Sequence, residues 1–484
     1  DGANDRQIFF RITLPNLRTI LTYTLVTSLI GGLNVFDIPK LLNKGGPDMV
    51  IPLQVYDEYH GNWYTVTGVR MELSSTLPLS SLTFETDPLT NMTSAADVWI
   101  ENVSGVTSVT IPEGVQKLKI GKFYDLVSLK LPSTVTSVYE YAFADNVSLK
   151  HFEWGGLRTI PRWAFANVGL EEIIVPDGTA LVDSAAFINS TQLKKVYIPD
   201  SVVTLGSDVF NGCTGLSDGR LPENEHITSL GSRFFKDCSS LETIHIPETV
   251  TKLDEWAFDG CSSLCHMNIP HALSELVTTV FGGCNAVFDE LTIPGTLEDA
   301  SLLPMNVKKL TVEEGVRKYI GWLYYTEEIV LPSSLEILPS VIGCKKATVP
   351  TAQYIQHSAD TLEELTLTST ETMGGALRNF VMLRKITLQE GVTFLPDEAF
   401  KGASSLPDIT IPSTVTSIGQ NAFEDCTSLK SIVVPEGVED LNEVAPTLTV
   451  NHHVETDDGV VVETVYDGGS EASFLIGTDE DSTI

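Results

Sequence analysis

Basic residues are scarce in this chain. Its 484 residues include 30 Lys and Arg against 64 Asp and Glu, a formal net charge of −34, and no Lys or Arg follows Lys430. A surface this acidic repels phosphate groups, which argues against nucleic acids and anionic membranes as partners of most of the chain. The acidic excess by itself indicates only a soluble body.

Closely spaced metal-binding cysteines are also missing. Structural zinc sites need pairs such as CxxC, and the only close pair among the seven cysteines is Cys261 with Cys265. Asn146 and Ser190 share a slot three residues after a recurring Phe with five cysteines: Cys213, Cys238, Cys261, Cys284 and Cys426. A slot that takes Cys, Asn or Ser predicts a small buried side chain that hydrogen-bonds the backbone at a turn. We therefore expect a structural ladder rather than disulfides or zinc.

The chain lacks a recognisable catalytic arrangement. The run GLSDG (215–219) matches the sequence motif of a nucleophile elbow. The repeat register, however, puts Ser217 at the start of a strand, and the sequence places no partner His beside it. His245 and His266 lack a third metal ligand. Adjacent residues in NHHVETDD (451–458) face opposite ways on a strand. We expect no catalytic residue, no metal site and no cofactor.

A repeated phrase fills most of the chain. SLETIHIPETVTKLDEWAFDGCS (240–262) returns as SLPDITIPSTVTSIGQNAFEDCT (405–427). Its Pro recurs every 23 to 25 residues, at Pro176, Pro199, Pro222, Pro247, Pro270 and Pro294. A fixed period of this length is typical of a solenoid of stacked coils. Such an array favours binding through an extended surface over reaction in one cleft.

The pattern within one coil predicts its structure. The alternation I-x-I-P predicts a strand with two inward apolar residues, which Pro ends because it has no N–H for the ladder. V-x-x-I predicts a corner, and A-F-x-x-C predicts a short helical or 3₁₀ segment on the convex side. The Phe of this segment is expected to fill the gap between coils, at Phe143, Phe165, Phe187, Phe210, Phe235, Phe258, Phe281, Phe400 and Phe423. Each coil then buries its apolar groups only against its neighbours.

The phrase L-x-x-I-x-I-P-x-x-V-x-x-I-x-x-x-A-F-x-x-C resembles the surface leucine-rich repeats of the BspA-like type, over about residues 49–435. The lead-in MVIPLQVYDEYHGNWYTVTGV (49–69) resembles the β-hairpin that opens such arrays. The resemblance implies a leucine-rich repeat solenoid with a parallel β-sheet on one face, at the cell surface or secreted, that serves in adhesion. We expect a β cap at 49–104, repeats at 105–435 and an acidic β-rich tail at 436–484. In the tail, two strand-like runs around a Gly-rich turn within 457–484 predict a hairpin.

Residues 1–48 share nothing with the repeats. No residue from Thr19 to Phe36 is charged, and this length is near the lower limit for a membrane-spanning helix, about 17 residues. The runs DGAN…FFRITLP and GGLNVFDIPKLLNKGGPD resemble the coupling loop and the following helix of bacterial sugar-type ABC importer permeases. Half of that motif is absent, so we expect a separate hydrophobic helix that is a fragment or a gene join. Any association with an inner membrane would run through residues 19–36 alone.

The register also predicts what each strand displays outward. The first inward strand residue of each coil, here called the marker, gives sixteen coils from Val109 to Ile432, with steps of 18 or 19 residues between Leu291 and Leu365. In the column before the marker the charge alternates in sign from Glu290 to Asp408, which predicts a self-neutralising ladder. In the column after it, Thr and Val prevail from Thr292 onward, as expected of good strand formers.

Between Glu153 and Asn268 the outward side chains are chemically mixed, and Tyr and Arg are the residues that dominate binding hot spots. We therefore predict a ligand patch formed by His151, Glu153, Tyr197, Arg220, His245, His266 and Asn268, with an ordinary solvated sheet face as the alternative. The favoured function is a non-enzymatic binding or adhesion protein, cell-surface or secreted, for a protein or glycan ligand. A membrane-anchored component associated with an ABC-type transporter is the alternative.

Overall fold

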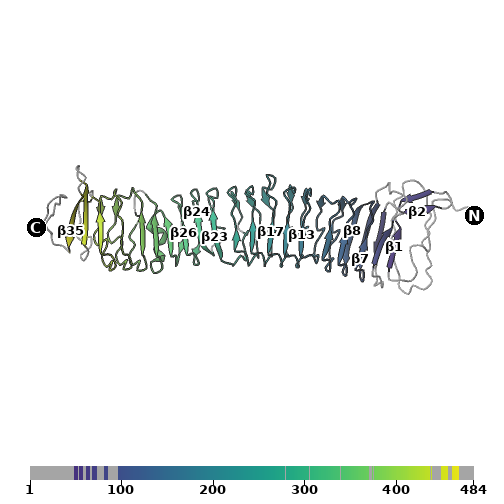
Figure 1. Cartoon of the computed structure of the whole chain (residues 1–484), viewed down its shortest axis with the longest axis horizontal. Coiled ribbons are helices and arrows are strands. Elements are labelled where there is room, and N and C mark those ends of the chain that lie inside the picture. The colour runs from purple at the N-terminus through teal and green to yellow at the C-terminus, as the bar shows by residue number, and fades with distance from the viewer. Residues whose placement is uncertain are drawn as a thin grey trace, which may run out of the picture. The chain divides into compact units, whose positions relative to one another are not determined.

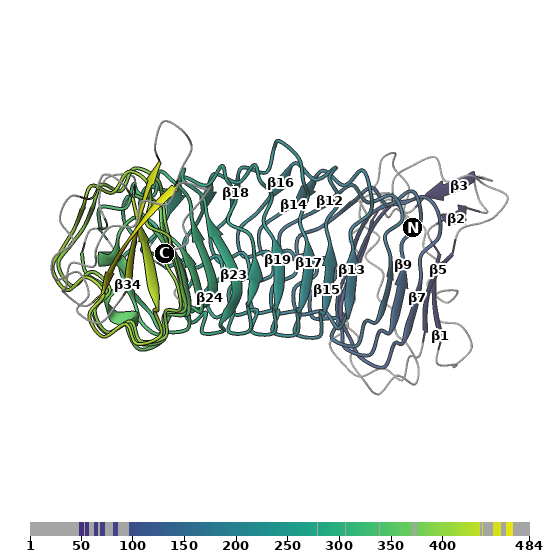
Figure 2. The same cartoon turned by 60° about the vertical axis from the view of Figure 1, so that its left-hand side comes forward.

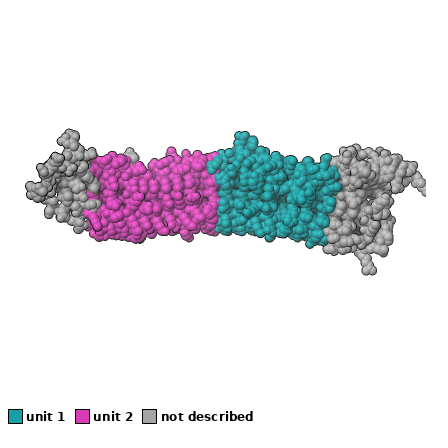
Figure 3. Space-filling view, in the orientation of Figure 1, with its two compact units in different colours: residues 1–264, 275–284 teal, residues 265–274, 285–484 magenta. Residues whose placement is uncertain are grey.

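The computed structural model describes residues 48–467 apart from 53, 58–61, 66–67, 73–80, 86–95, 278, 305, 338, 370–372, 374, 436–437, 439–448 and 456–460. The chain divides into two compact units, coloured separately in Figure 3. Unit 1 comprises Asp1–Leu264 and Glu275–Cys284, and unit 2 comprises Cys265–Ser274 and Asn285–Ile484. The hydrophobic helix expected at 19–36 lies outside the described residues, as does the permease-like segment before Asp48.

Short parallel strands build one side of unit 1, where successive coils lie next to one another (Figure 1). The first ladder runs in the order β1 (Asp48–Pro52), β5 (Ser81–Glu85), β7 (Ser108–Thr110), β9 (Ser128–Lys130) and β11 (His151–Glu153). A second contains β13 (Glu172–Ile174), β15 (Lys195–Tyr197), β17 (Asp218–Arg220) and β19 (Thr243–His245), seen side by side in Figure 2. The register pairs Val109 with Leu129 and Ile173 with Val196, so the predicted markers are confirmed there.

The remaining strands of unit 1 form shorter ladders. These are β4 (Gly68–Glu72), β6 (Ala96–Val103), β8 (Val115–Phe123) and β10 (Ser137–Val138); β12 (Thr159–Ile160), β14 (Leu181–Val182) and β16 (Thr204–Leu205); and β18 (Ser229–Leu230), β20 (Lys252–Leu253) and β22 (Glu275–Leu276). The last two sets come from the V-x-x-I corners. The antiparallel pair β2 (Gln54–Asp57) and β3 (Asn62–Thr65) confirms the expected opening hairpin.

The repeat Phe side chains stack through the interior of unit 1. Ring centroids of Phe187 and Phe210 lie 5.5 Å apart at 5°, and those of Phe258 and Phe281 lie 5.6 Å apart at 8°. The predicted cysteine ladder is present beside them. Cys213 Sγ donates to the Phe187 carbonyl at 3.1 Å, and the Ser190 hydroxyl donates to the Phe165 carbonyl at 3.0 Å. None of the seven cysteines is disulfide-bonded.

The expected helical or 3₁₀ form of the A-F-x-x-C segments is wrong for unit 1. These segments, which we call the turn side, are successive turns in which the residues two before and two after the Phe have positive φ, for example 54° at Trp163 and 54° at Asn167. A left-handed residue on each side interrupts any run of helical dihedrals. The backbone N–H of Phe165 instead donates to the Ala186 carbonyl of the next coil at 2.8 Å. Hydrogen bonds between coils therefore replace those within a helix.

Unit 2 is built in the same way. Its main ladder runs in the order β23 (Phe288–Ile293), β24 (Val307–Val312), β26 (Glu328–Val330), β28 (Lys346–Val349), β29 (Glu364–Leu367) and β30 (Lys385–Leu388). The unit also contains β21 (His266–Met267), β25 (Trp322–Leu323) with β27 (Ser340–Val341), and β31 (Phe394–Leu395) with β32 (Ser417–Ile418). The markers Leu291, Leu310 and Ile329 pair in register as predicted.

The one helix among the described residues is the 3₁₀ helix η2 (Ala352–Ser358), in a short coil that has lost the Ala-Phe element. Nowhere in the described part of the chain is a helix long and apolar enough to cross a membrane.

The described part of the tail adds two strands to β33. β33 (Ser431–Val434) is extended in parallel by β34 (Thr449–Glu455), which pairs antiparallel with β35 (Val461–Asp467). β35 falls in the first strand-like run, whereas the run after the Gly-rich turn lies outside the described residues. β33 offers an open parallel edge, which β34 takes before β35 returns along its other side.

Candidate binding surfaces

Three residues of the predicted patch lie together on the side of unit 1 that the strand ladders form, here called the strand side. Tyr197, Arg220 and His245 occupy consecutive strands in register. The Arg220 guanidinium carbon lies 4.7 Å from the centroid of the Tyr197 ring. One nitrogen of Arg220 donates to both carboxylate oxygens of Asp200, at 3.0 and 3.1 Å. The Glu223 N–H and the Arg220 guanidinium lower the pKa of Asp200, so Arg220 is already matched with an ionised carboxylate of its own chain.

The other predicted residues belong to other strands. His151 and Glu153 belong to β11 in the first ladder, where the Glu153 carboxylate pairs with Lys130 at 2.7 Å. His266 and Asn268 belong to unit 2, where His266 Nε2 lies 2.9 Å from Asp289 Oδ2. His151 and Glu153 therefore lie in a different ladder from Tyr197, Arg220 and His245.

The predicted charge ladder of unit 2 is confirmed in register from Glu290 to Lys385. Within it, Lys346 Nζ lies 3.1 Å from Glu364 Oε1. The ladder borders a shallow hollow of about 160 Å³ that Thr348 and Thr366 also line. Opposite charges on neighbouring strands account for this surface without a ligand.

Sequence reasoning missed a polar and aromatic group on the turn side of unit 1. Trp99 and Glu101 project from the same side of β6, and Lys119 lies opposite Trp99 on β8. Lys119 Nζ contacts Glu101 Oε1 at 2.8 Å and lies 4.3 Å from the Trp99 ring centroid. The Trp99 indole N–H donates to Glu101 Oε2 at 2.9 Å. Burial alone would raise the pKa of Glu101, but hydrogen bonds from Lys119 and Trp99 outweigh it and lower that pKa.

Tyr141 extends this group toward solvent. Its ring is 42% exposed, and its backbone has a φ of 58°. Trp163 of the following coil stacks on the ring at 4.7 Å and 12°, while Lys119 of the preceding coil has its Nζ 5.9 Å from the ring centroid. Arg162 in turn lies 4.7 Å from the centroid of the Trp163 ring. One side of Tyr141 is therefore covered by an aromatic neighbour, and the other looks toward β8.

A cavity of about 360 Å³ lies beside Tyr141, and we call it the Tyr141 pocket. It is lined by Glu101, Lys119, Gly121, Lys122, Tyr141, Ala144 and Asp145. Two carboxylates and two ammonium groups thus face one aromatic side chain. Gly121 has no side chain to occupy this space, and a Cβ there would lie only 3.2 Å from the Tyr141 carbonyl oxygen. The pocket combines an exposed ring with balanced charges.

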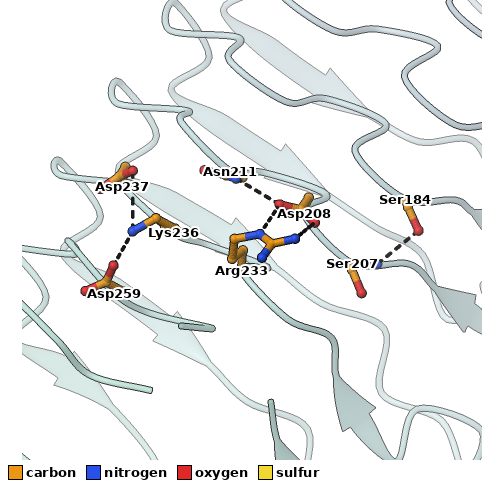
Figure 4. A network of polar contacts seen from close by, with 8 residues as sticks. All are labelled: Ser184, Ser207, Asp208, Asn211, Arg233, Lys236, Asp237 and Asp259. Atoms are coloured by element: carbon orange, nitrogen blue, oxygen red, sulfur yellow. Dashed lines mark hydrogen bonds and ion pairs between the residues drawn. The ribbon is translucent and has the colours of Figure 1, made fainter. Parts of the chain in front are cut away.

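Further along the turn side of unit 1 the charged side chains satisfy one another (Figure 4). Arg233 donates to both oxygens of Asp208, at 2.7 and 3.1 Å. Lys236 pairs with Asp259 and lies 3.8 Å from Asp237. This network joins neighbouring coils, so its charges have a structural explanation.

Unit 2 has an exposed aromatic surface of its own. Trp322, Tyr324 and Tyr325 are 54%, 59% and 55% exposed. The Trp322 and Tyr324 rings lie 6.1 Å apart at 13°, as alternate residues on one side of an extended segment do. These rings supply apolar contact area in a coil that has no Ala-Phe element.

The family model described as BspA type leucine rich repeat region, in 6 copies, matches residues 100–217, 180–301 and 354–446, together more than half of the chain. The permease resemblance of residues 1–48 gains no support, since the match begins at residue 100. No curated protein matches the chain.

Solved structures similar to the chain include a leucine-rich repeat protein from Bacteroides ovatus, 19% identical, with a TM-score of 0.32, covering 80% of this chain and 88% of that one. A leucine rich cell surface protein from Faecalibacterium prausnitzii is 19% identical, with a TM-score of 0.28 and coverage of 82% and 83%. The pneumococcal vaccine antigen PcpA is 17% identical, with a TM-score of 0.36 and coverage of 80% and 84%. Likeness at this level does not bear on what this chain binds.

Proposed function

We propose that this chain, which belongs to the BspA-type leucine-rich repeat family, is a non-enzymatic binding protein of the cell surface or exterior that recognises a glycan. The observation that carries the proposal is the Tyr141 pocket, where an exposed ring stands among charged groups of both signs.

The size and shape of the pocket suit a small ligand. Its volume of about 360 Å³ falls at the lower end of the range for ligand sites, about 300–1,000 Å³. A tyrosine ring offers an apolar face with a polar tip, which suits a ligand that has apolar C–H surfaces and polar edges. Sugar rings have both. The stacked Trp163 holds the Tyr141 ring in place, at 4.7 Å between centroids, so little side-chain entropy is lost on binding.

The charges of the pocket favour a neutral ligand rich in hydroxyl groups. Glu101 and Asp145 accept hydrogen bonds, whereas Lys119 and Lys122 donate them. A hydroxyl both donates and accepts, so neighbouring hydroxyls of one sugar satisfy both kinds of group. A phosphate or an amine would meet a repelling charge together with an attracting one. Glu101 is already oriented by Lys119 and Trp99, which prepares its carboxylate for recognition.

A protein ligand on the strand side is the second candidate. The Tyr197 and Arg220 pair supports it, because these side chains stack at 4.7 Å and Tyr197 is 39% exposed. Tyr and Arg are the residues in which interface energy concentrates. Since Arg220 also pairs with Asp200 at 3.0 Å, a partner would have to add contacts without breaking this pair. The Tyr141 pocket joins an exposed ring to a cavity and is the favoured site.

Titration calorimetry with lactose, maltose and cellobiose as probes tests the proposal. We expect one of these neutral disaccharides to bind the full chain, and Tyr141→Ala to weaken that binding about tenfold or more, since truncation of a Tyr at a binding hot spot costs about 2 kcal/mol or more. Alanine is compatible with the backbone there, because Ala185 occupies the equivalent left-handed position at a φ of 56°.

Tyr324→Ala is the matched control. It removes a 59% exposed tyrosine from unit 2, and we expect it to leave binding unchanged. Equal binding by the Tyr141 variant and the native chain would overturn the proposal, as would the absence of binding to all three sugars. Loss of binding in a Tyr197→Ala variant alone would move the site to the strand side.

A further inference from the structure

Cys265 differs from the other six cysteines. Six thiols are held by backbone carbonyls in or near the interior, for example Cys261 Sγ on the Phe235 carbonyl at 3.1 Å and Cys344 Sγ on the Lys346 carbonyl at 2.9 Å. Cys265 is partly exposed at the entry to β21. In the next coils of unit 2 the equivalent position carries Asp289 and then Lys308, both charged. The Cys265 thiol thus stands at a position that the next coils give to charged side chains.

Three side chains of unit 2 form a line of contacts that begins at this thiol. Cys265 Sγ lies 3.2 Å from His266 Nδ1, and His266 Nε2 lies 2.9 Å from Asp289 Oδ2. The other oxygen of Asp289 accepts from Lys308 Nζ at 2.6 Å. The backbone fixes the arrangement, because the Asp289 N–H donates to the Cys265 carbonyl at 3.3 Å. Nucleophile, base and orienting carboxylate thus stand in line.

The Asp289 carboxylate favours one tautomer of the His266 imidazole. The hydrogen bond and charge of Lys308 lower the pKa of Asp289, so this carboxylate is ionised at neutral pH and acts as an acceptor. It draws the proton of neutral His266 to Nε2, which leaves Nδ1 as an acceptor facing the thiol.

We infer that Cys265 is a reactive thiol and a modification site, at which His266 acts as base and the substrate is a small disulfide. In the step, the Cys265 proton moves to His266 Nδ1 and the sulfur attacks one sulfur of a disulfide R–S–S–R. The bond from Cys265 to that sulfur forms as the R–S–S–R bond breaks. The leaving thiolate takes the proton from His266, so one disulfide and one thiol are consumed and one of each is produced. His266 and Asp289 are half exposed, at 50% and 48%, and a small disulfide can reach them.

The other thiols supply an internal contrast. Burial raises the pKa of Cys213, Cys284 and Cys344 to about 12, which keeps these groups protonated and slow at neutral pH. Exchange on the folded chain should therefore be confined to one of seven positions.

The experiment treats the folded full chain with oxidised glutathione and, separately, with 5,5′-dithiobis(2-nitrobenzoic acid), and maps the adduct by peptide mass spectrometry. We expect a single adduct at Cys265, formed about tenfold or more faster than the average thiol of the urea-unfolded chain reacts. Cys265→Ser should abolish it. His266→Gln should slow it about tenfold or more, because the proton acceptor is lost.

His271→Gln is the matched control. His271 is an exposed histidine of unit 2 with a carboxylate partner, Glu313 at 3.5 Å, and we expect its loss to leave the rate unchanged. Three results would each overturn the inference: an adduct on another cysteine, a folded-state rate equal to that of the unfolded chain, or a native rate in His266→Gln. Circular dichroism of each variant, matching the native chain, assigns a changed rate to chemistry instead of misfolding.

Discussion

Removal of the Phe258 side chain probes the interior that neighbouring coils share. Phe258 is fully buried, at 0% exposure. Its ring stacks on Phe235 at 5.6 Å and 23° and on Phe281 at 5.6 Å and 8°. Its backbone N–H donates to the Val280 carbonyl at 2.9 Å, and its carbonyl accepts from Cys284 Sγ. Phe258→Ala removes the ring but keeps these backbone contacts, so the variant isolates the packing contribution.

The expected loss follows from two contributions. Truncation of a buried Phe to Ala costs about 3–5 kcal/mol through lost burial and the cavity left behind. The two ring contacts contribute about 0.5–1.5 kcal/mol each beyond burial, and both are lost together, which places Phe258→Ala in the upper half of that range. Phe394→Ala is the control. Phe394 is 43% exposed in β31, and its loss should cost less than about 1 kcal/mol.

Native-state hydrogen exchange measures the loss coil by coil. This readout suits a repeat array, in which stability is a sum of local and nearest-neighbour contributions. We expect reduced protection in the coils that contain Phe235, Phe258 and Phe281, with a smaller effect farther away. A loss of stability below about 1 kcal/mol in these coils would refute the shared interior. It would mean that the Phe258 ring is not the main side chain that fills the space between coils.

Three further predictions concern a thiol, a carboxylate and a pair of glycines. Burial raises the pKa of Cys261 well above 9.0, so the stability that the protonated thiol contributes is complete below pH 9 and is lost as the pH rises above that value. Cys261→Ser can keep the bond to the Phe235 carbonyl, and it should reduce this alkaline loss of melting temperature in thermal melts from pH 8 to 11. The pKa of Glu101 is lowered from 4.5, so its contribution is present above that value and disappears as pH falls through the lower folded value; Glu101→Gln should reduce the fall in melting temperature between pH 6 and 3. Gly260 and Gly343 have φ of 80° and 79°, but a Cβ would lie 2.5 Å from a carboxylate oxygen at Gly260 and within 4 Å of nothing at Gly343. In urea unfolding, Gly343→Ala should cost about 1 kcal/mol from backbone strain and Gly260→Ala clearly more, and equal costs would contradict the crowding.

The coil and its interior could be predicted from sequence because their signal is local and periodic. The marker Ile173, the stacked Phe187 and the slot of Cys213 each recur with the same neighbours, and the register and hydrogen bonds agree with them. The turn side could not be predicted in the same way. Trp163 adopts a left-handed backbone at a φ of 54° despite its bulk, because hydrogen bonds to the next coil impose it. That cause is tertiary and leaves no mark at this position of the phrase.

The Tyr141 pocket and the Cys265 group were missed for a related reason. Glu101 and Lys119 lie on β6 and β8, which precede the first repeat Phe, Phe143, and only the strand register places them together. In the sequence Cys265 stands out only by its spacing from Cys261, and the partner of His266, Asp289, comes from the following coil. An exposed aromatic two residues before the repeat Phe, as at Tyr141, was the one available signal for the pocket.

Hydrogen exchange of the full chain with and without the disaccharide that binds most tightly tests the central claim, that recognition takes place at the Tyr141 pocket. Added protection should be confined to β6, β8 and the turn around Tyr141, and it should vanish in Tyr141→Ala. Protection that appears instead on β15, β17 and β19, or none at a saturating sugar concentration, would contradict the account.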